Sequence, residues 1–170
     1  SKRKGINNFV NFLTKYEKFL FNVQFILVGR LDNDSEIHRE YLKNCSVLQW
    51  IDTYIEEEVL QEMYSEADYI MLPYTMEFNG SSGVFAHACS HAKPVIATSH
   101  GCIGFRVNEF KLGKTFKSGN YVEMFNVIQQ ACSINFTEYQ EMVKHAYQYA
   151  LNNSMEAHQK IILQGLTEWK

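Results

Sequence analysis

One stretch of the sequence, Asp68–His100, constrains the fold of the chain more than any other. It contains an apolar run that stops at Pro73, a loop of small residues, a short helix and a second apolar run. The loop, residues 79–83 (NGSSG), cannot continue a strand, and its small side chains would let a ligand approach the backbone closely. Small and apolar residues predict a buried helix over Val84–Ala92, and the apolar run Val95–Ala97 predicts the buried strand that follows it.

A strand, a loop and a helix in this order are part of the unit that builds parallel sheets. In such a sheet the loop lies at the carboxyl edge, over the amino end of the helix that follows it. Unpaired N–H groups and the positive end of the helix dipole bind phosphate at this place. Loops of glycine and serine also serve as plain connections, so residues 79–83 are open to two interpretations, a phosphate site and a simple turn.

Apolar runs separated by helical patterns continue through the first two thirds of the chain. They predict four parallel strands, adjacent in one layer, at Val23–Val28, Val47–Ile51, Asp68–Leu72 and Val95–Thr98, with a short edge strand at 112–116. Apolar residues at helical spacing predict the intervening helices, at Gly5–Leu20, Ser35–Asn44 and Glu56–Ala67. Thr53, three residues before Glu56, predicts a capping box at the start of the last of these. The predicted fold class is α/β, a doubly wound, Rossmann-like parallel sheet with helices on both faces.

The last third of the sequence is mostly helical. The glycines of Gly101–Arg106 predict a loop, and Arg106–Phe110 predicts a short helical turn. Three helices are predicted to begin near Asn120, Thr137 and Ser154 and to end near Cys132, Leu151 and Trp169. We expect this C-terminal helical tail to pack on one face of the sheet or to reach a neighbouring domain.

Composition limits the class of function. The chain has 46% hydrophobic residues and a net charge of −3, which fits one domain spanning 1–170 and gives no support to nucleic-acid binding through a broad basic surface. The cysteines are far apart in sequence, which favours reduced thiols over a disulfide framework or a zinc site, and two of them are predicted on apolar helix faces, Cys89 and Cys132. No signal peptide is evident, and no apolar run reaches the roughly 18 residues of a membrane span. The opening residues, Ser1-Lys2-Arg3-Lys4-Gly5, suggest a piece of a longer protein.

Four segments, taken in order, resemble the C-terminal, donor-binding half of a GT-B glycosyltransferase, and family 4 is the most similar. Lys4-Gly5 before a helix resembles the end of that family's Arg-then-Lys-Gly segment, and residues 25–29 (FILVG) resemble its second strand and glycine. Residues 63–73 (MYSEADYIMLP) resemble its Y-x-x-A-D-x-x-x-x-P segment. Gly80–Ala97, which ends in KPVIA, resembles its phosphate loop, helix and G-K-P-V-I-A strand. The resemblance covers roughly Arg3–Phe116.

This resemblance implies a domain that binds a nucleotide sugar and faces a second, N-terminal acceptor domain that lies outside this chain. It implies neither a metal nor a cofactor, because the nucleotide sugar is the donor substrate, and it leaves the catalytic residues unassigned. The residues expected at the donor are Lys4, Arg30, Asn79, Gly80, Ser81, Ser82, Gly83, Val84 and His87. In that arrangement the diphosphate lies against the amides of residues 81–84, with Lys4 as a candidate cation on its far side.

The sequence departs from the family at an acidic pair. The family carries two glutamates, with seven residues between them, that flank the phosphate loop; the second contacts the ribose hydroxyls, and the first lies near the donor sugar. Alignment on Lys93-Pro94 places Asn79 and His87 at these positions, while Glu77 is nearby but out of register. A carboxylate accepts from two hydroxyls at once, whereas a neutral histidine has one ring acceptor. His87 therefore has two interpretations, a ligand contact and a packing residue in a polar pocket.

Two functions remain open. The first is the donor-binding domain of a hexosyltransferase-like enzyme in surface polysaccharide or lipid-linked glycan synthesis. Such an enzyme would be cytoplasmic, at the inner face of the membrane, and the isolated chain would be inactive. The second is a non-catalytic scaffold domain descended from such an enzyme, which the lost acidic pair would explain. A response-regulator-like domain fits poorly, because no acidic cluster ends the first strand. Base recognition is expected after the strand Val47–Ile51, where Trp50, Asp52 and Tyr54 are candidates for it or for core and surface roles.

Overall fold

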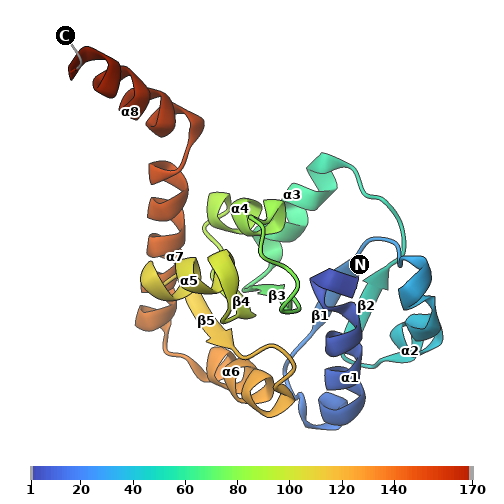
Figure 1. Cartoon of the computed structure of the whole chain (residues 1–170). Helices are drawn as coiled ribbons and strands as arrows, with labels where there is room; N and C mark the ends of the chain where they lie inside the picture. The colour runs from blue at the N-terminus through green and yellow to red at the C-terminus, as the bar shows by residue number, and fades with distance from the viewer. Residues whose placement is uncertain (1, 169–170) are drawn as a thin grey trace.

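The computed structural model describes residues 2–168, with side chains as far as residue 164. The strands of this part are β1 (Phe25–Val28), β2 (Leu48–Ile51), β3 (Ile70–Leu72), β4 (Val95–Thr98) and β5 (Gly113–Phe116). The α-helices are α1 (Ile6–Tyr16), α2 (Arg39–Asn44), α3 (Glu57–Glu66), α4 (Gly83–Ser90), α5 (Gly101–Glu109), α6 (Tyr121–Ser133), α7 (Phe136–Asn152) and α8 (Met155–Glu168). Short 3-10 helices are η1 (Lys2–Lys4), η2 (Glu17–Phe19) and η3 (Asn33–His38). Strands and helices alternate as far as α6, which confirms the predicted α/β class (Figure 1).

The described strands pair in parallel, in two groups. β1 pairs with β2, from Phe25 opposite Leu48 to Val28 opposite Ile51. β4 lies between β3 and β5 in the second group. The predicted parallel pairing is confirmed, but the prediction that all four long strands adjoin is wrong at one place, because β1 and β3 do not pair. Apolar content predicts that a strand is buried, not which strand lies beside it.

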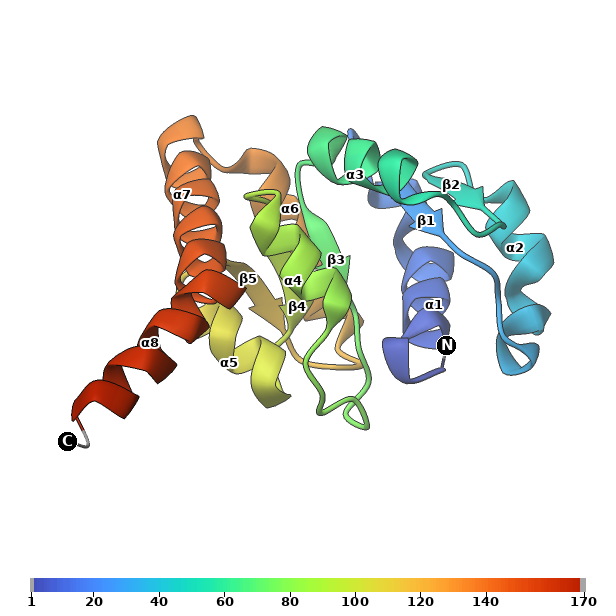
Figure 2. The same ribbon diagram turned by 90° about the horizontal axis from the view of Figure 1, so that it is seen from above.

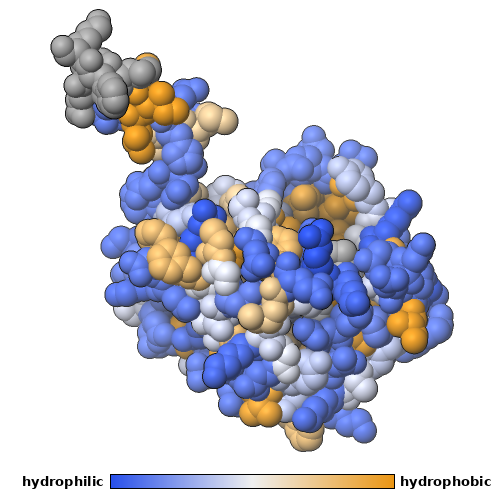
Figure 3. Space-filling model, viewed as in Figure 1, coloured by the Kyte–Doolittle hydropathy of each residue, from blue (hydrophilic) through white to orange (hydrophobic). Residues whose placement is uncertain are grey.

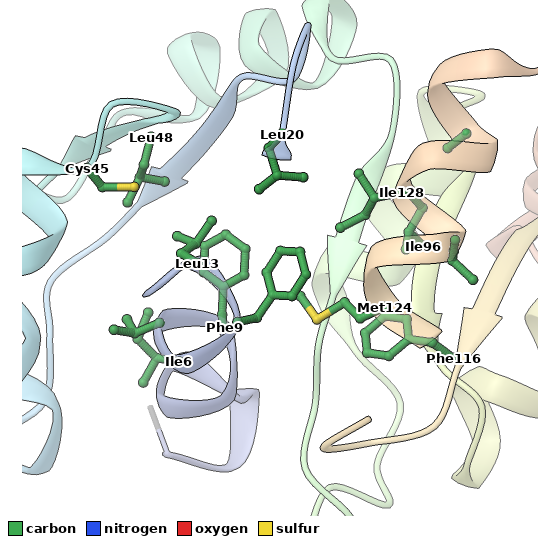
Figure 4. Close-up of a cluster of buried hydrophobic side chains, with 14 of the residues drawn as sticks. Ile6, Phe9, Leu13, Leu20, Cys45, Leu48, Ile96, Phe116, Met124 and Ile128 are labelled. Carbon is green, nitrogen blue, oxygen red and sulfur yellow. The ribbon is translucent and has the colours of Figure 1, made fainter. Parts of the chain in front are cut away.

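Helices cover both faces of these strands, with α3 and α4 above and α1 and α6 below in Figure 1. The lower face holds the larger core cluster, to which α1 and α6 contribute buried side chains (Figure 4). The largest of these are Phe9, Phe12, Leu13 and Met124. On the upper face, α4 and α5 pack against β3, β4 and Leu112, which follows α5. Its buried members include Phe85, Cys89, Ile103 and Val107. Helices on both faces are what the doubly wound prediction requires.

Residues 101–109 form a helix, α5, so the predicted loop is wrong there. Gly104 is buried in this helix, and a Cβ atom on it would lie within 2.8 Å of the Cα atom of Ser99. Glycine therefore lets α5 approach the segment after β4 closely, and its small size serves packing instead of a turn. Ile103 and Val107, on the same helix, are buried in the upper core cluster.

The helical tail divides into a packed part and a projecting part. Tyr149 of α7 lies against Phe85 of α4 and Phe110 after α5, with ring centroids 5.6 and 5.1 Å apart. α8 extends away from the body of the molecule and carries exposed apolar surface (Figures 1 and 3). The predicted end near Trp169 lies outside the described residues. None of the described helices is both long and apolar enough to cross a membrane.

Helix starts were predicted with mixed success. Asn120 caps α6 by accepting a hydrogen bond from the N–H of Glu123 at 3.1 Å, as expected. Thr53 does not cap α3, because its hydroxyl donates to the carbonyl oxygen of Tyr54 at 3.3 Å and the helix begins only at Glu57. A capping box needs the intervening residues to be helical, and here they remain irregular.

The cysteines are free thiols in different surroundings. Cys45 and Cys89 are buried, Cys102 is half-buried and Cys132 is exposed. The prediction of reduced cysteines agrees with this, but the predicted burial of Cys132 is wrong, since it follows Ala131, the last buried residue of α6. Within residues 2–168, no group of three or more His, Cys, Asp or Glu side chains is placed to hold a metal ion.

Candidate functional site

Several connections meet at the carboxyl edge of the parallel strands, around Tyr74 and Thr75. The N–H of Thr75 donates to the carbonyl oxygen of Arg3 in η1 at 3.1 Å. Nε2 of His100, between β4 and α5, donates to the Thr75 carbonyl oxygen at 2.8 Å. The hydroxyl of Ser118, between β5 and α6, donates to the Tyr74 carbonyl oxygen at 3.1 Å. Three neighbouring segments thus anchor the start of the loop that leads from β3 to α4.

Ser82 holds the other end of this loop at the start of α4. Its hydroxyl oxygen accepts a hydrogen bond from the N–H of Phe85 at 3.3 Å and lies 2.9 Å from the hydroxyl of Tyr74. Burial raises the pKa of the Tyr74 phenol, and the contact with Ser82 offsets part of that rise. The phenol is therefore neutral at physiological pH and can donate to Ser82. Tyr74 and Ser82 together fix the position of the helix end.

The amino end of α4 presents unused backbone donors. The first hydrogen bond of the helical ladder runs from the N–H of Ala86 to the carbonyl oxygen of Ser82 at 3.0 Å. The N–H groups of Gly83 and Val84 precede it, so they are the groups that an anion at the helix end can engage. Ser81 and Gly83 are exposed, and no acidic residue lies in the first turn to compete for these donors.

The loop borders open space. A Cβ atom built on Gly83 would have no heavy atom within 4 Å, and one on Gly80 would meet only the ring of Phe78 at 3.9 Å. Asn79 lies beside the start of α5, where a Cβ atom on Gly101 would be 3.6 Å from its Oδ1. The loop therefore forms an open rim between the amino ends of α4 and α5.

Lys4 and Arg30, the two predicted cations, lie on different elements. Gly5 next to Lys4 is buried with φ +82°, and a Cβ atom on it would lie 2.7 Å from the carbonyl carbon of Pro73 and closer still to the oxygen. Only glycine lets η1 run this near the end of β3, and this brings the exposed Lys4 to the same edge as the loop. Arg30 is exposed after β1, and no hydrogen bond or ion pair within residues 2–168 joins it to the loop.

The candidates for base recognition have structural partners. Arg39 forms an ion pair with Asp52, and its guanidinium lies 5.0 Å from the centre of the Trp50 ring. The indole N–H of Trp50 donates to the carbonyl oxygen of Gly29 at 3.0 Å. Tyr54 is 84% exposed. Trp50 and Asp52 thus hold α2 against β2, and of the three only Tyr54 is free to move toward a ligand.

His87 faces α3. Its ring stacks on Tyr64 with centroids 5.6 Å apart, and His91 stacks on the same tyrosine at 5.1 Å. Tyr64 is buried, and burial raises its pKa to about 12. His87 itself is exposed. The packing interpretation of His87 therefore has direct support, and its contact with a ligand stays a prediction.

Comparison with known families decides the classification. The sequence profile described as "Glycosyl transferases group 1" matches residues 1–148. The chain belongs to this family. Its fold is that of the C-terminal domain of a GT-B glycosyltransferase, as the resemblance of its motifs predicted. None of the curated proteins matches the sequence.

Solved structures share the fold of this glycosyl transferase domain at low sequence identity. OtsA in its apo form is 12% identical, with a TM-score of 0.73 over 98% of this chain and 41% of OtsA. WaaG, described as a glycosyltransferase involved in lipopolysaccharide biosynthesis, is 18% identical, with a TM-score of 0.66 over 90% of this chain and 40% of WaaG. The C-terminal domain of LpcC from Francisella tularensis is 13% identical, with a TM-score of 0.72 over 90% of this chain and 80% of that domain. The glycosyl transferase domain thus spans about two fifths of OtsA and WaaG.

Three residues that shape this edge of the glycosyl transferase domain were not found from the sequence: Tyr74, Tyr64 and His100. Tyr74 is the second residue after the strand β3, and side chains at carboxyl strand ends line the binding edge of such sheets, so this signal could have found it. Tyr64 and His100 act through contacts with His87 and Thr75, which are distant in sequence. No local pattern marks them.

Proposed function

We propose that the chain is the donor-binding domain of a glycosyltransferase that moves a sugar from a nucleotide sugar to an acceptor. The observation that carries the proposal is the open amino end of α4, where the N–H groups of Gly83 and Val84 precede the helical ladder at the carboxyl edge of the sheet. Phosphate is a ligand that such a helix end binds readily. The family supplies the reaction class.

In the proposed complex, the donor diphosphate lies against the backbone amides of residues 81–84. The helix dipole contributes about 0.3–1 kcal/mol for an exposed charge and up to roughly 2 kcal/mol for a partly buried one. Direct hydrogen bonds from N–H groups to phosphate add to this. Lys4 supplies positive charge from η1, and Arg30, after β1, is the second candidate cation. Asn79 and Gly80 border the donor sugar.

His87 occupies the place proposed for ribose recognition, with one ring acceptor for two hydroxyls. A second candidate function, a non-catalytic scaffold, rests on a specific observation. His87 already packs on Tyr64, and neither it nor Asn79 is acidic. The two functions differ in one measurable property, the affinity for a nucleotide diphosphate.

Calorimetric titration of UDP, GDP and ADP tests the proposal. The parent chain is expected to bind at least one of them. Gly83→Val is expected to weaken that binding by about tenfold or more, equivalent to about 1.4 kcal/mol. The reason is that Gly83 borders open space, so a branched side chain blocks the phosphate without disturbing a protein contact at Cβ. If the parent binds no more tightly than Gly83→Val, the phosphates do not lie on this loop.

His87→Glu is the second variant, because it restores an acceptor for two hydroxyls. It is expected to tighten binding of the same nucleotide. His91→Glu is the matched control, since it adds the same charge at the far end of α4. Equal effects of the two variants would contradict a ribose contact. If none of these proteins binds any of the three nucleotides, the scaffold function is the better description.

The complete reaction requires an acceptor site. We propose that it belongs to a separate N-terminal domain and that closure of the two domains excludes water and aligns the reacting atoms. The nucleotide sugar is the donor substrate, and the proposed reaction uses no metal and no separate cofactor. The description of WaaG as a lipopolysaccharide enzyme supports a surface polysaccharide or lipid-linked glycan as product. Such a reaction would take place in the cytoplasm, at the inner face of the membrane.

A further inference from the structure

Two histidines, His87 in α4 and His91 directly after it, lie on the side of this helix that faces α3. In both ribbon views α3 lies beside α4 (Figures 1 and 2), and the two imidazole rings stack on Tyr64 of α3, at 14° and 22° from the plane of its ring. The imidazole centroids are 6.5 Å apart. Residues four apart on a helix are neighbours on one face. Tyr64 therefore holds two neighbouring imidazoles in nearly parallel planes.

The hydrogen bonds of His91 determine which of its ring nitrogens is free. Nδ1 lies 2.8 Å from the carbonyl oxygen of His87, and a carbonyl oxygen can only accept a hydrogen bond. Nδ1 therefore carries the proton and donates, and Nε2 keeps an unshared electron pair. The hydroxyl of Ser90 donates to the same carbonyl oxygen at 2.9 Å and lies 3.3 Å from Nδ1. A histidine that binds a metal ion is commonly oriented in this way, by a hydrogen bond from its other ring nitrogen to a backbone carbonyl.

His87 can supply a second nitrogen. Its side chain is exposed, and among the described residues neither of its ring nitrogens takes part in a hydrogen bond or an ion pair. With metal–nitrogen distances of about 2.0–2.1 Å, two imidazoles on one ion have ring centroids about 5–6.5 Å apart. The observed 6.5 Å is at the upper end of that range. A small rotation of the exposed His87 side chain is therefore enough to complete a pair of ligands.

The surroundings of this pair favour a cation. α3 carries no lysine or arginine, and it carries four glutamates that are all exposed, Glu57, Glu58, Glu62 and Glu66. The pair also lies at the carboxyl end of α4, where the helix dipole is negative. Lys93 is a cation of the same region, but its ammonium group donates to the carbonyl oxygen of Ser65 at 2.6 Å. The negative potential of α3 and of the helix end therefore attracts positive ions to the two imidazoles.

We propose that His87 and His91 form a bidentate site for a divalent transition-metal ion, with water completing its coordination. Imidazole suits copper, zinc and nickel, whereas magnesium and calcium prefer oxygen ligands. Two histidines four residues apart on one helix face are a spacing that binds zinc. The described residues place no third His, Cys, Asp or Glu ligand beside this pair. The ion is therefore exchangeable, unlike a structural zinc with four protein ligands, and it takes no part in the proposed sugar transfer.

Calorimetric titration of Cu²⁺, Zn²⁺ and Mg²⁺ into the parent chain, without nucleotide and in a buffer that does not bind metals, tests the site. The tightest step is expected to take up one Cu²⁺ or Zn²⁺ per chain, with Cu²⁺ bound more tightly and Mg²⁺ not bound. His87→Gln and His91→Gln keep a polar side chain but leave a single imidazole. Each is expected to weaken binding by at least about tenfold, because the second ligand no longer benefits from being linked to the first.

Two controls separate this pair from other histidines. His158→Gln removes an exposed histidine of α8, and His145→Gln removes one whose Nε2 lies 4.0 Å from Glu141. Both variants should bind as the parent does. NMR of the ring nitrogens adds an independent readout, in which Zn²⁺ should shift Nε2 of His91 while Nδ1 stays protonated. The proposal is overturned if the parent binds neither ion, if His87→Gln or His91→Gln binds as the parent does, or if the shift appears at His145 or His158 instead.

The site also affects nucleotide binding, a consequence that rests on the proposed function. A neutral imidazole has one acceptor, so a metal ion on His87 leaves none for a ribose hydroxyl. Zn²⁺ should therefore weaken nucleotide binding by the parent more than by His91→Gln, and any capture of Zn²⁺ by free nucleotide affects both proteins equally. Equal weakening in the two proteins would contradict this competition. Zinc bound at the pair in a chain that binds none of UDP, GDP and ADP would contradict the proposed function alone.

Discussion

Replacing Gly5 with alanine tests how much the fold depends on the close approach of η1 to the end of β3. Gly5 has φ +82°, and a left-handed conformation costs about 1–2 kcal/mol for a residue with a side chain. The new Cβ atom would also overlap the carbonyl group of Pro73 and lie 3.4 Å from the Cα atom of Tyr74. Overpacking of this kind costs about 1–3 kcal/mol. The expected loss in the free energy of unfolding is the sum, about 2–5 kcal/mol.

Gly119→Ala is the matched control, because Gly119 has a similar φ of +77° but a Cβ atom there would have no heavy atom within 4 Å. Urea denaturation followed by circular dichroism measures both variants on one scale. Gly5→Ala is expected to lose about 1–3 kcal/mol more than Gly119→Ala, which is the overpacking contribution alone. Equal losses would refute the argument that contact with Pro73 determines the position of η1. A destabilised η1 should also weaken the binding of any nucleotide that contacts Lys4.

Three further predictions concern pH, thiol reactivity and turnover. Hydrogen bonds from the hydroxyl and the N–H of Ser46 lower the pKa of Glu17 from its usual 4.5. The ionised Glu17 therefore stabilises the fold above pH 4.5, and this stabilisation is lost as the pH falls through the lowered pKa. Glu17→Gln should therefore flatten the acid limb of a stability-versus-pH curve, and an unchanged limb would contradict the assignment. Burial raises the pKa of both the Cys89 thiol, to about 12, and the Cys132 thiol, but Cys89 is buried whereas Cys132 is exposed. A maleimide at about pH 7 should therefore label Cys132 before Cys89, as peptide mass spectrometry can show. The 170-residue chain alone is expected to transfer no sugar in a nucleotide-release assay with any nucleotide sugar, and measurable transfer would rule out the two-domain mechanism.

Local patterns predicted the strands well because a strand buried on both faces leaves a continuous apolar run, as Val95–Thr98 does. The same patterns failed where a residue serves a distant contact. A glycine at position 104 suggests a loop, yet Gly104 lies inside α5, where any side chain would clash with Ser99. Thr53 has the spacing of a cap, but the chain after it is not helical. The missing pairing of β1 with β3 also depends on segments far apart in sequence.

The sequence predicted the candidate site only in part, for the same reason. The start of α4 was predicted to within one residue of Gly83, because a loop of small residues before an apolar helix is a local signal. The placement of Lys4 at the same edge of the sheet was predicted from the resemblance, and the contact of Gly5 with Pro73 explains it. The stacking of His87 on Tyr64 could not be predicted, because it depends on how α3 lies against α4.

The position of α1 has a consequence for how the domain unfolds. Phe9 of α1 lies edge-on to Phe25 of β1, with ring centroids 5.2 Å apart, and Tyr16 stacks on Phe125 of α6 at 4.9 Å. No backbone ladder joins β1 to β3 in the described residues, so packing of this kind, together with the hydrogen bond from the N–H of Thr75 to Arg3, connects the two groups of strands. We therefore expect the two groups to unfold as separate foldons that are coupled by α1. Weakening α1 should reduce the cooperativity of unfolding before it reduces the stability of either foldon.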